Sequence, residues 1–429
     1  MSDRTKTAST ASHPALEMAD GRTTLAVAGK AYRADRAGTF RALHAAARPL
    51  LTKLTFLGTT PAAYTHADVT RVLRDSAQFA VDPATVGRKG RLGVAWWMPQ
   101  AFRNLGDNML GRDGESHRRL RRLVDHAFTR REIASMQTRV AEIADELIAP
   151  HRASGKPFDL VSHIARPLPL RVIVDLLGLD PKRIPEFSRL APKVVNLEKP
   201  WHFARMIPGV LAMNKLLLSE VRAARRDERP GLISELVRAE ADGDTLTEDE
   251  LVTMLFLLLF AGHETTVHLI STSVRALRRD VPEPAFPTGE TGEVSPEQLN
   301  AVTELMRYCA PVEMTEPRYA VSDVEVAGHA MKRGEPIVAL LAAANRDPTT
   351  YDTPDVLDLA RDPNPQTGFG GGPHTCLGAQ LARIEAAIVL NAMFNDGPAI
   401  ELVDPDAFPQ WQFSPGFHGH RRLMVRFAG

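Results

Sequence analysis

The stretch that decides the fold class is Phe369-Gly-Gly-Gly-Pro-His-Thr-Cys376-Leu-Gly378. Its three consecutive glycines let the backbone approach a neighbouring group closely, and Cys376 opens a predicted helix that runs to Phe394. A helix N-terminus favours the thiolate, which is the form of cysteine that binds metals or attacks electrophiles. A lone cysteine beside a glycine-rich turn is usually a buried, inert thiol. The spacing F-x-x-G-x-H-x-C-x-G favours a functional cysteine instead, because five specified positions in ten rarely coincide by chance.

A second polar segment, Ala261-Gly-His-Glu-Thr-Thr266, interrupts a long apolar helix that we predict over Thr247–Arg279. Polar side chains in a buried helix cost several kcal/mol unless they are partnered, so they indicate function. One alternative is a zinc protease site, which needs histidines at i and i+4 on one helix face. His268 follows His263 at i+5, about 140° further round the helix, and this spacing excludes the zinc motif.

The composition narrows the class of protein. The chain has 429 residues, 52 basic and 52 acidic side chains, and two cysteines. So few cysteines exclude a disulfide scaffold and Cys-rich zinc modules, and the balanced charge disfavours a protein that coats nucleic acid. The longest run without a charge or histidine, Leu251–Gly262, is shorter than the ~20 residues that cross a bilayer. The N-terminus has no apolar signal-peptide core, so we expect a cytoplasmic protein without a membrane anchor.

The cysteine loop resembles that of the cytochrome P-450 superfamily, the haem-thiolate monooxygenases. The resemblance covers roughly residues 51–427 and is greatest to soluble bacterial members. It implies haem b as cofactor, with Cys376 as the axial ligand of the iron, His374 as a donor to a haem propionate, and Phe369 packed near the sulfur. A thiolate ligand pushes electron density onto the iron and favours O–O cleavage. The other haem-binding residues that it implies are Gly378 and Ala261.

Residues 261–265 match the family's distal motif, A/G-G-x-D/E-T. The resemblance implies that Thr265 holds dioxygen and its water, that Glu264 relays protons from solvent, and that Gly262 leaves the groove for oxygen. One oxygen atom would then be reduced to water and the other inserted into a C–H bond or alkene. Two alternatives stay open: a peroxide-dependent haem-thiolate enzyme, which usually lacks the acid–Thr pair, and a haem-based ligand sensor, which needs none. We expect only ordinary polar contacts from Thr266, His263 and His268.

Glu304-Leu-Met-Arg307 places an acid and a base at i and i+3 of a short predicted helix. Such a pair is ordinarily a surface ion pair of little energetic value. Here it matches the family's E-x-x-R, which implies a buried pair that holds the proximal scaffold, with Arg361 as its third member. We expect these three residues to be structural rather than catalytic.

The stretch Gly114–Val124 carries four arginines between positions 118 and 122, a pattern that is often just a solvated face. However, His117 and Arg121 share one helix face and match the family's H-x-x-x-R, whose cations bind haem propionates. Arg318 stands where the family places another propionate-binding arginine, and buried anions call for converging cations. The remaining arginines could dock an acidic electron donor, so we expect electrons from NAD(P)H through ferredoxin reductase and ferredoxin: these are Arg118, Arg119 and Arg122.

The resemblance also places the substrate pocket. An apolar lining argues for a lipophilic substrate, and the wording A-G-H-E-T-T-V around Thr265 is similar to macrolide- and polyketide-tailoring members. A terpenoid or steroid hydroxylase is the alternative. The pocket residues that we expect are Trp96, Trp97, Met98, Phe102, Leu257, Val312, Met314 and Phe413.

We therefore predict a mainly α-helical protein with a minor β region: a cytochrome P-450 fold that encloses haem b between a long central helix and a proximal cysteine loop and helix. Residues 1–20 are expected to form a flexible tail and residues 21–429 one domain of a monomer. Strands are predicted over 23–27, 53–57, 321–326 and 337–340, and helices over 116–124, 132–148, 170–177, 185–225 (broken near 199–200 and 208–209), 247–279, around 304, and 376–394, with a loop over 282–295.

Overall fold

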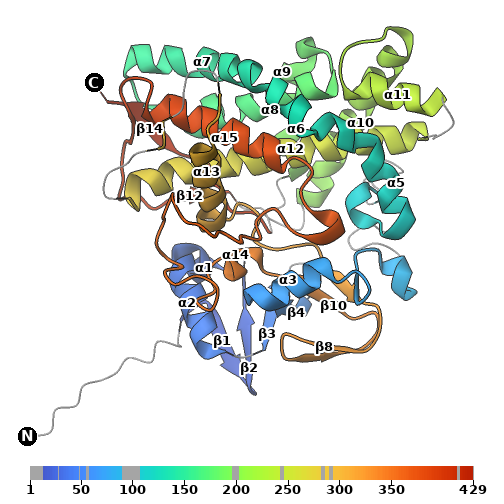
Figure 1. Ribbon diagram of the computed structural model, residues 1–429, viewed down its shortest axis with the longest axis vertical. Helices are drawn as coiled ribbons and strands as arrows, with labels where there is room; N and C mark the ends of the chain where they lie inside the picture. The colour runs from blue at the N-terminus through green and yellow to red at the C-terminus, as the bar shows by residue number, and fades with distance from the viewer. Residues whose placement is uncertain are drawn as a thin grey trace, which may run out of the picture.

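The structure is a computed structural model that describes residues 13–27, 29–47, 49–54, 58–88, 107–195, 202–241, 246–281, 286–288, 293–412 and 416–428. Long helices fill one part of the molecule, and a twisted sheet flanked by short helices fills the other (Figure 1). The long helices are α5 (Gly114–Asp125), α7 (Gln137–Ser154), α8 (Pro167–Leu177), α9 (Ile184–Val195), α10 (His202–Arg226), α11 (Leu232–Ala241), α12 (Glu248–Arg279), α13 (Pro296–Cys309) and α15 (Ala379–Phe394). The predicted mainly α-helical class with a minor β region is confirmed.

Helix α12 runs through the middle of the helical part (Figure 1). It begins with the capping box that its sequence predicts: the Thr247 side chain accepts from the Glu250 N–H, and the Glu250 carboxylate accepts from the Thr247 N–H. Its neighbours are α8, α10, α13 and α15. By length and composition α12 could cross a membrane, but most of its side chains are buried against these elements. All-round hydrophobicity therefore reflects a central core helix.

The main sheet lies beside α1 (Lys30–Ala34), α2 (Arg36–Ala46) and α3 (His66–Arg74) (Figure 1). Among the described residues it has seven strands in the order β1-β2-β3-β4-β10-β7-β5. The pairing of Ile337 on β10 with Arg318 on β7 is antiparallel, and it brings the start of β7 toward the helical part. The strands are β1 (Leu16–Ala19), β2 (Arg22–Leu25), β3 (Leu50–Leu54), β4 (Gly58–Ala63), β5 (Phe79–Ala80), β7 (Arg318–Ala320) and β10 (Pro336–Ala339).

Three smaller sheets complete the described β structure: β11-β14-β6, β12-β13 and β8-β9. The hairpin of β12 and β13 lies against α12 and bears on the site described below. The bounds of these strands are β6 (Phe158–Asp159), β8 (Val324–Val326), β9 (His329–Met331), β11 (Ile400–Leu402), β12 (Gln410–Trp411), β13 (His420–Arg422) and β14 (Met424–Phe427). The short helical elements are α6 (Arg130–Ser135), α14 (Leu341–Ala344), η1 (Pro83–Val86), η2 (Met109–Gly111), η3 (His126–Phe128), η4 (Val161–Ala165), η5 (Pro181–Arg183) and η6 (Gly372–His374).

Several predicted boundaries were wrong. The predicted break at Pro208-Gly209 does not occur, because α10 continues through Pro208; the close packing of Gly209 on Lys193 of α9 holds the helix there. The predicted helix 132–148 is instead α6 and α7, divided at Met136. The helix around Glu304 is not short, since α13 spans 14 residues. The predicted break at 199–200 lies outside the described residues.

Two ends of elements also differ from the prediction. Residues 16–19, which the prediction assigns to a flexible tail, instead pair with Arg22–Leu25 as an antiparallel hairpin. Helix α15 begins at Ala379, so Cys376 precedes the helix by three residues instead of opening it. The reason is the local turn: Thr375 donates from its backbone to Gly372, and Cys376 donates to Phe369. The cysteine is therefore held by the loop rather than by the helix.

Candidate active site

One face of the middle of α12, at Ala261 and Thr265, is less buried than the neighbouring turns of the helix and is called the groove below. Ala261 is exposed there and Thr265 is partly exposed, although the flanking turns of the helix are buried. The Thr265 hydroxyl donates to the Ala261 carbonyl at 2.7 Å. Thr266, one position on and about 100° round the helix, is buried and donates to the Gly262 carbonyl at 3.3 Å. The two adjacent hydroxyls therefore lie on different faces of α12, and of these two only the Thr265 hydroxyl lies on the partly exposed face.

Glu264 is buried on another face of α12 and is fully partnered. Its Oε1 accepts from the Gln412 side-chain amide at 2.9 Å, and its Oε2 accepts from the Arg166 guanidinium at 3.3 Å. His268 and His263 approach the two oxygens at 3.6 Å and 3.7 Å. Burial alone would raise the pKa of Glu264, but His268, Arg166, His263 and Gln412 together lower it. The carboxylate is thus ionised and held behind the groove.

The glycine-rich loop holds Cys376 by backbone contacts. Gly372 has φ +64°, and a Cβ there would lie 2.5 Å from the Leu73 carbonyl oxygen, so only glycine fits this close approach. The Cys376 N–H donates to the Phe369 carbonyl at 2.9 Å, which turns the exposed thiol away from the core. Although the residue is exposed, protein surrounds the thiol closely enough that desolvation raises its pKa, whereas the Gly378 N–H and the arginines 121 and 383 lower it. A backbone N–H aimed at sulfur is what a thiolate ligand needs.

A cluster of basic side chains lies beside this loop. The rings of His117 on α5 and His374 are 4.3 Å apart, and both line a cavity of about 210 Å³ together with Arg318. Among the described residues, neither Nε2 of His117 nor Nδ1 of His374 has a hydrogen-bond partner. Burial, His374 and Arg121 lower the pKa of His117 to about 4. Arg121 points to the cysteine loop, where it donates to the Thr375 carbonyl at 2.7 Å.

The residues present fit haem b, which the resemblance implies. The site has imidazole nitrogens without partners and a buried Arg318 guanidinium, and such groups are suited to binding an anion. The two propionates of haem are carboxylates and would supply that anion. An exposed thiol on a glycine loop is a suitable soft ligand for its iron. Cys376, His117, Arg318, His374 and Arg121 would hold the group.

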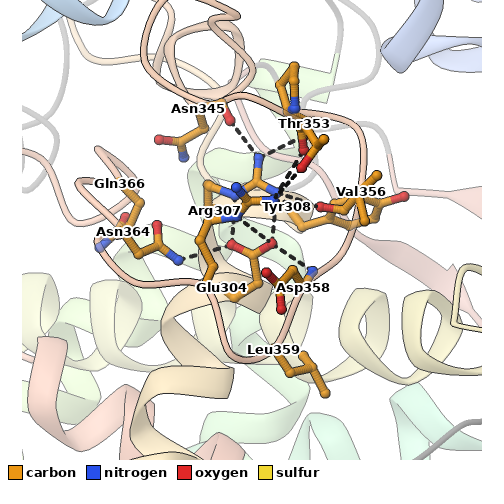
Figure 2. A network of polar contacts seen from close by, with 12 residues as sticks. Glu304, Arg307, Tyr308, Asn345, Thr353, Val356, Asp358, Leu359, Asn364 and Gln366 are labelled. Atoms are coloured by element: carbon orange, nitrogen blue, oxygen red, sulfur yellow. Dashed lines mark hydrogen bonds and ion pairs between the residues drawn. The ribbon is translucent and has the colours of Figure 1, made fainter.

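The Glu304–Arg307 pair is fully buried and forms the centre of a network (Figure 2). Arg307 donates to both carboxylate oxygens of Glu304, at 2.7 Å and 2.8 Å. It also donates to the backbone carbonyls of Asn345, Pro354 and Val356. Arg361 donates to Glu304 at 3.2 Å, so the expected third contact is present. These bonds tie α13 to the loop that precedes the cysteine segment.

The predicted pocket residues are only partly described. Val312 and Met314 are half-buried in the segment that leads into β7, and Leu257 is half-buried on α12. Val312 forms a bridge with Phe417, which ties this segment to the C-terminal hairpin. The other predicted pocket residues lie outside the described residues: Trp96, Trp97, Met98, Phe102 and Phe413.

The arginines left for docking are largely paired. Arg118 and Arg122 both contact Glu115, at 2.8 Å and 3.3 Å, and all three side chains are exposed. Arg119 instead contacts Glu250 at the start of α12, at 2.6 Å. One shared acid leaves a net positive charge at Arg118 and Arg122, whereas Arg119 fixes α5 to α12.

Three contacting residues did not emerge from the sequence. Arg166, between η4 and α8, and Gln412, after β12, reach Glu264 from 98 and 148 residues away. No local pattern marks either residue, since neither belongs to a motif. Asp113 accepts from the backbone N–H groups of Val81 and Asp82 and lies 3.6 Å from His374. Asp113 stands just before the helix that carries His117, but an aspartate at this position suggests a helix N-cap rather than a contact with His374.

Comparison with known proteins identifies the family of this chain. The cytochrome P450 family model matches residues 299–396. The chain is 37% identical over 331 residues to the polyketide biosynthesis cytochrome P450 PksS of Bacillus subtilis, covering 76% of this chain and 78% of the relative. It is 37% identical over 323 residues to the mycinamicin IV hydroxylase/epoxidase of Micromonospora griseorubida, covering 74% and 79%.

The solved structures point the same way. A myxobacterial cytochrome P450 crystallised with myristic acid has a TM-score of 0.81 to this chain at 31% sequence identity, with 94% of this chain and 99% of that chain covered. This likeness confirms the predicted fold, which extends well beyond the matched family segment. The chain therefore belongs to the cytochrome P450 family and is a P450 monooxygenase, an enzyme that works with haem and O₂.

Proposed function

We propose that this monooxygenase hydroxylates or epoxidises a lipophilic secondary metabolite of the polyketide or macrolide type. Two relatives carry names of that kind, a polyketide biosynthesis P450 and a mycinamicin hydroxylase/epoxidase. The described part of the predicted pocket is apolar, with Leu257, Val312 and Met314 half-buried beside the Thr265 groove or the C-terminal hairpin. Such a lining suits a large apolar substrate held by few polar contacts.

The observation that carries the proposal is the exposed Cys376 thiol together with the unpartnered imidazole nitrogens and the buried Arg318 guanidinium at one edge. Cys376 would bind the iron, with Phe369 and Gly378 beside it. His117, Arg318 and His374 line one cavity, where two of their ring nitrogens have no partner among the described residues, and they would hold the propionates together with Arg121 beside the cysteine loop. When bound there, haem supplies the activation of O₂ and the transfer of one oxygen atom.

The α12 residues supply protons and position. Thr265 borders the groove with its hydroxyl on the Ala261 carbonyl, where it can orient a water or oxygen. Glu264 lies one residue earlier as an ionised carboxylate that can take up a proton from solvent and pass it toward Thr265. The intact acid–alcohol pair favours an O₂-dependent over a peroxide-dependent enzyme.

Electrons are proposed to come from NAD(P)H through a ferredoxin reductase and a ferredoxin. Arg118 and Arg122 form an exposed basic patch on α5, the helix that also carries His117. An acidic donor that docks on this patch would stand close to the haem-binding edge. We also propose that the enzyme acts in the cytoplasm, where such donors are available.

The test of the iron ligand is the spectrum of the reduced, CO-bound protein. Wild type should show the thiolate-type Soret band, and Cys376→Ala should lose it while Cys309→Ala, which removes the buried second cysteine, should keep it. A thiolate band that persists in Cys376→Ala would refute the assignment.

The substrate class is tested by the spin-state change that follows displacement of water from the iron. A panel of macrolactones, linear polyketides, terpenoids, steroids and fatty acids would be titrated into the ferric holoenzyme. Tightest binding by macrolactones or polyketides supports the proposal. Tightest binding by a steroid or terpenoid would replace it with the alternative hydroxylase.

A further inference from the structure

The described part of the β12–β13 hairpin lies between α12 and residues 312–314. These three residues belong to the segment predicted to line the substrate pocket, and we call them the substrate wall. On the wall side, Val312 forms a bridge with Phe417, and the Glu313 N–H donates to the Gly416 carbonyl at 2.8 Å. The wall itself is firmly anchored, because the Glu313 carboxylate binds the Tyr32 hydroxyl at 2.7 Å. Because Glu313 is anchored in this way, a ligand that presses on the junction of Val312 and Phe417 displaces the hairpin rather than the wall.

On its other side the hairpin is pressed against α12. A Cβ at Gly419 would overlap the ring of His268, so only glycine allows the strand to come this close. The Gln412 N–H donates to the Gly419 carbonyl at 2.8 Å, which fixes Gln412 opposite this contact. From there the Gln412 amide reaches Glu264 Oε1 at 2.9 Å. The described part of the hairpin thus touches both the substrate wall and the acid.

The acid is held from two directions. Gln412 binds Oε1, while Arg166 binds Oε2 from the corner between η4 and α8. The other titratable groups that face Glu264 are His263 and His268 of α12 itself. Burial lowers the pKa of His263 to about 4, so it is neutral at pH 7 and Arg166 is the permanent positive charge. Behind His268 lie His420 of the hairpin and Arg275 of α12.

We propose that Gln412 is a positioning residue that links occupation of the substrate pocket to proton delivery by Glu264. With the pocket empty, Gln412 and Arg166 hold the carboxylate behind the groove. A ligand that presses on the wall at Val312 and Phe417 shifts the hairpin, lengthens the Gln412 bond and frees the carboxylate. Glu264 then takes up a proton from solvent, passes it toward Thr265 and returns to the carboxylate, so protons balance over the cycle. The inference rests on the proposed roles of Glu264 and Thr265.

The first measurement is an infrared titration of the Glu264 carboxyl in the ferric holoenzyme, with Glu264→Gln to assign the band. The probe is 4-phenylimidazole, a small aromatic iron ligand that fills the pocket. In wild type, binding of 4-phenylimidazole should raise the titration midpoint by about one pH unit, the size expected for losing one hydrogen bond to a charged group. In Gln412→Leu the midpoint should already be raised, and 4-phenylimidazole should add little.

The second measurement is NAD(P)H oxidation without substrate, in the presence of ferredoxin and its reductase. It should rise by about threefold or more in Gln412→Leu, because a freed acid delivers protons to an empty pocket. Gln412→Asn, which keeps the amide, should restore part of the wild-type rate. The matched control is Gln410→Leu, an exposed position on the same hairpin that should behave as wild type. Gly419→Ala should raise substrate-free oxidation as Gln412→Leu does, because the added methyl group pushes the hairpin away from α12. This variant replaces Gln412→Leu in the test if Gln412→Leu does not bind haem.

Two results would overturn the inference: a Glu264 midpoint that 4-phenylimidazole does not move in wild type, or equal substrate-free oxidation in wild type, Gln412→Leu and Gly419→Ala. These failures differ from a failure of the proposed function. If Gln412→Leu changes neither measurement while the CO spectrum and Thr265→Ala behave as expected, only the proposed role of Gln412 is wrong. If no infrared band responds to Glu264→Gln in any state, the role of Glu264 itself is wrong.

Discussion

At the scale of single residues, two neighbouring threonines of α12 make a controlled comparison. Thr265 borders the groove and Thr266 is buried, yet each donates only to the carbonyl four residues earlier. Thr265→Ala should cut product formed per NAD(P)H by roughly tenfold and divert reductant to peroxide, because a proton-transfer group is lost. Thr266→Ala should leave the coupling near wild type. The measurement is product, peroxide and NAD(P)H oxidised with the substrate found in the spin-state screen; equal coupling in both variants would contradict the role of Thr265.

Sequence predicts the contacts of a residue when its partner stands only a few positions away along the chain. Glu304 and Arg307 stand at i and i+3, so one turn of helix brings them together. The Cys376 loop is likewise a local pattern of glycines and a turn. Arg166 and Gln412 could not be predicted in this way, because their contact with Glu264 depends on how α8 and the C-terminal hairpin pack on α12. Spacing along the chain carries no information about such contacts.

At the scale of elements, the network around Arg307 joins α13 to the loop before Cys376. Arg307→Met should destabilise the protein by about 3–5 kcal/mol, because Glu304 would stay buried without its main partner. Chemical denaturation and haem content per protein measure the loss. Arg139→Met is the control: its side chain is half-exposed, and its ion pairs with Glu142 and Asp175 should contribute about 1 kcal/mol or less. Similar losses in both variants would show that the network does not hold the proximal side.

The cysteine loop offers a second test at this scale. Gly372 and Gly155 have similar positive φ angles, +64° and +58°, but a Cβ at Gly155 would meet nothing within 4 Å. Gly155→Ala should therefore cost only the conformational strain, about 1–2 kcal/mol. Gly372→Ala must also push the loop off the Leu73 carbonyl, which displaces Cys376 and should lower haem retention. Equal melting temperatures and equal haem content in the two variants would refute a special role for this close approach.

Element boundaries show where local propensity is overruled. The sequence predicts the start of helix α12 correctly, because its capping box and its apolar run are both local patterns of neighbouring residues. Pro208 was read as a break, but α10 continues because its packing on α9 outweighs the loss of one helical hydrogen bond. The start of α15 was placed too early for the opposite reason, since the turn from Gly372 to Thr375 keeps Cys376 out of the helix. Tertiary contacts decide such ends.

At the scale of the whole molecule, the protein buries histidines that must stay neutral. Burial lowers the pKa of His263 to about 4, and burial, Arg275 and His268 lower that of His420 to about 3. His263 lies beside Arg166, and His420 lies near His268, where α12 meets the C-terminal hairpin. In the unfolded chain each histidine would titrate near its ordinary pKa of ~6.5.

This difference sets how stability depends on pH. Between about pH 6.5 and pH 4 the unfolded chain binds more protons than the folded protein, so the free energy of unfolding rises with pH and falls on acidification. Each such histidine contributes a slope of up to about 1.4 kcal/mol per pH unit in that window. Urea unfolding of the holoprotein at several pH values should show this slope, and His420→Gln should reduce it by up to one such increment. A stability that stays flat from pH 7 to pH 4.5, or a slope in the double variant His263→Gln/His420→Gln that equals the wild-type slope, would show that these two histidines take up protons without unfolding the core.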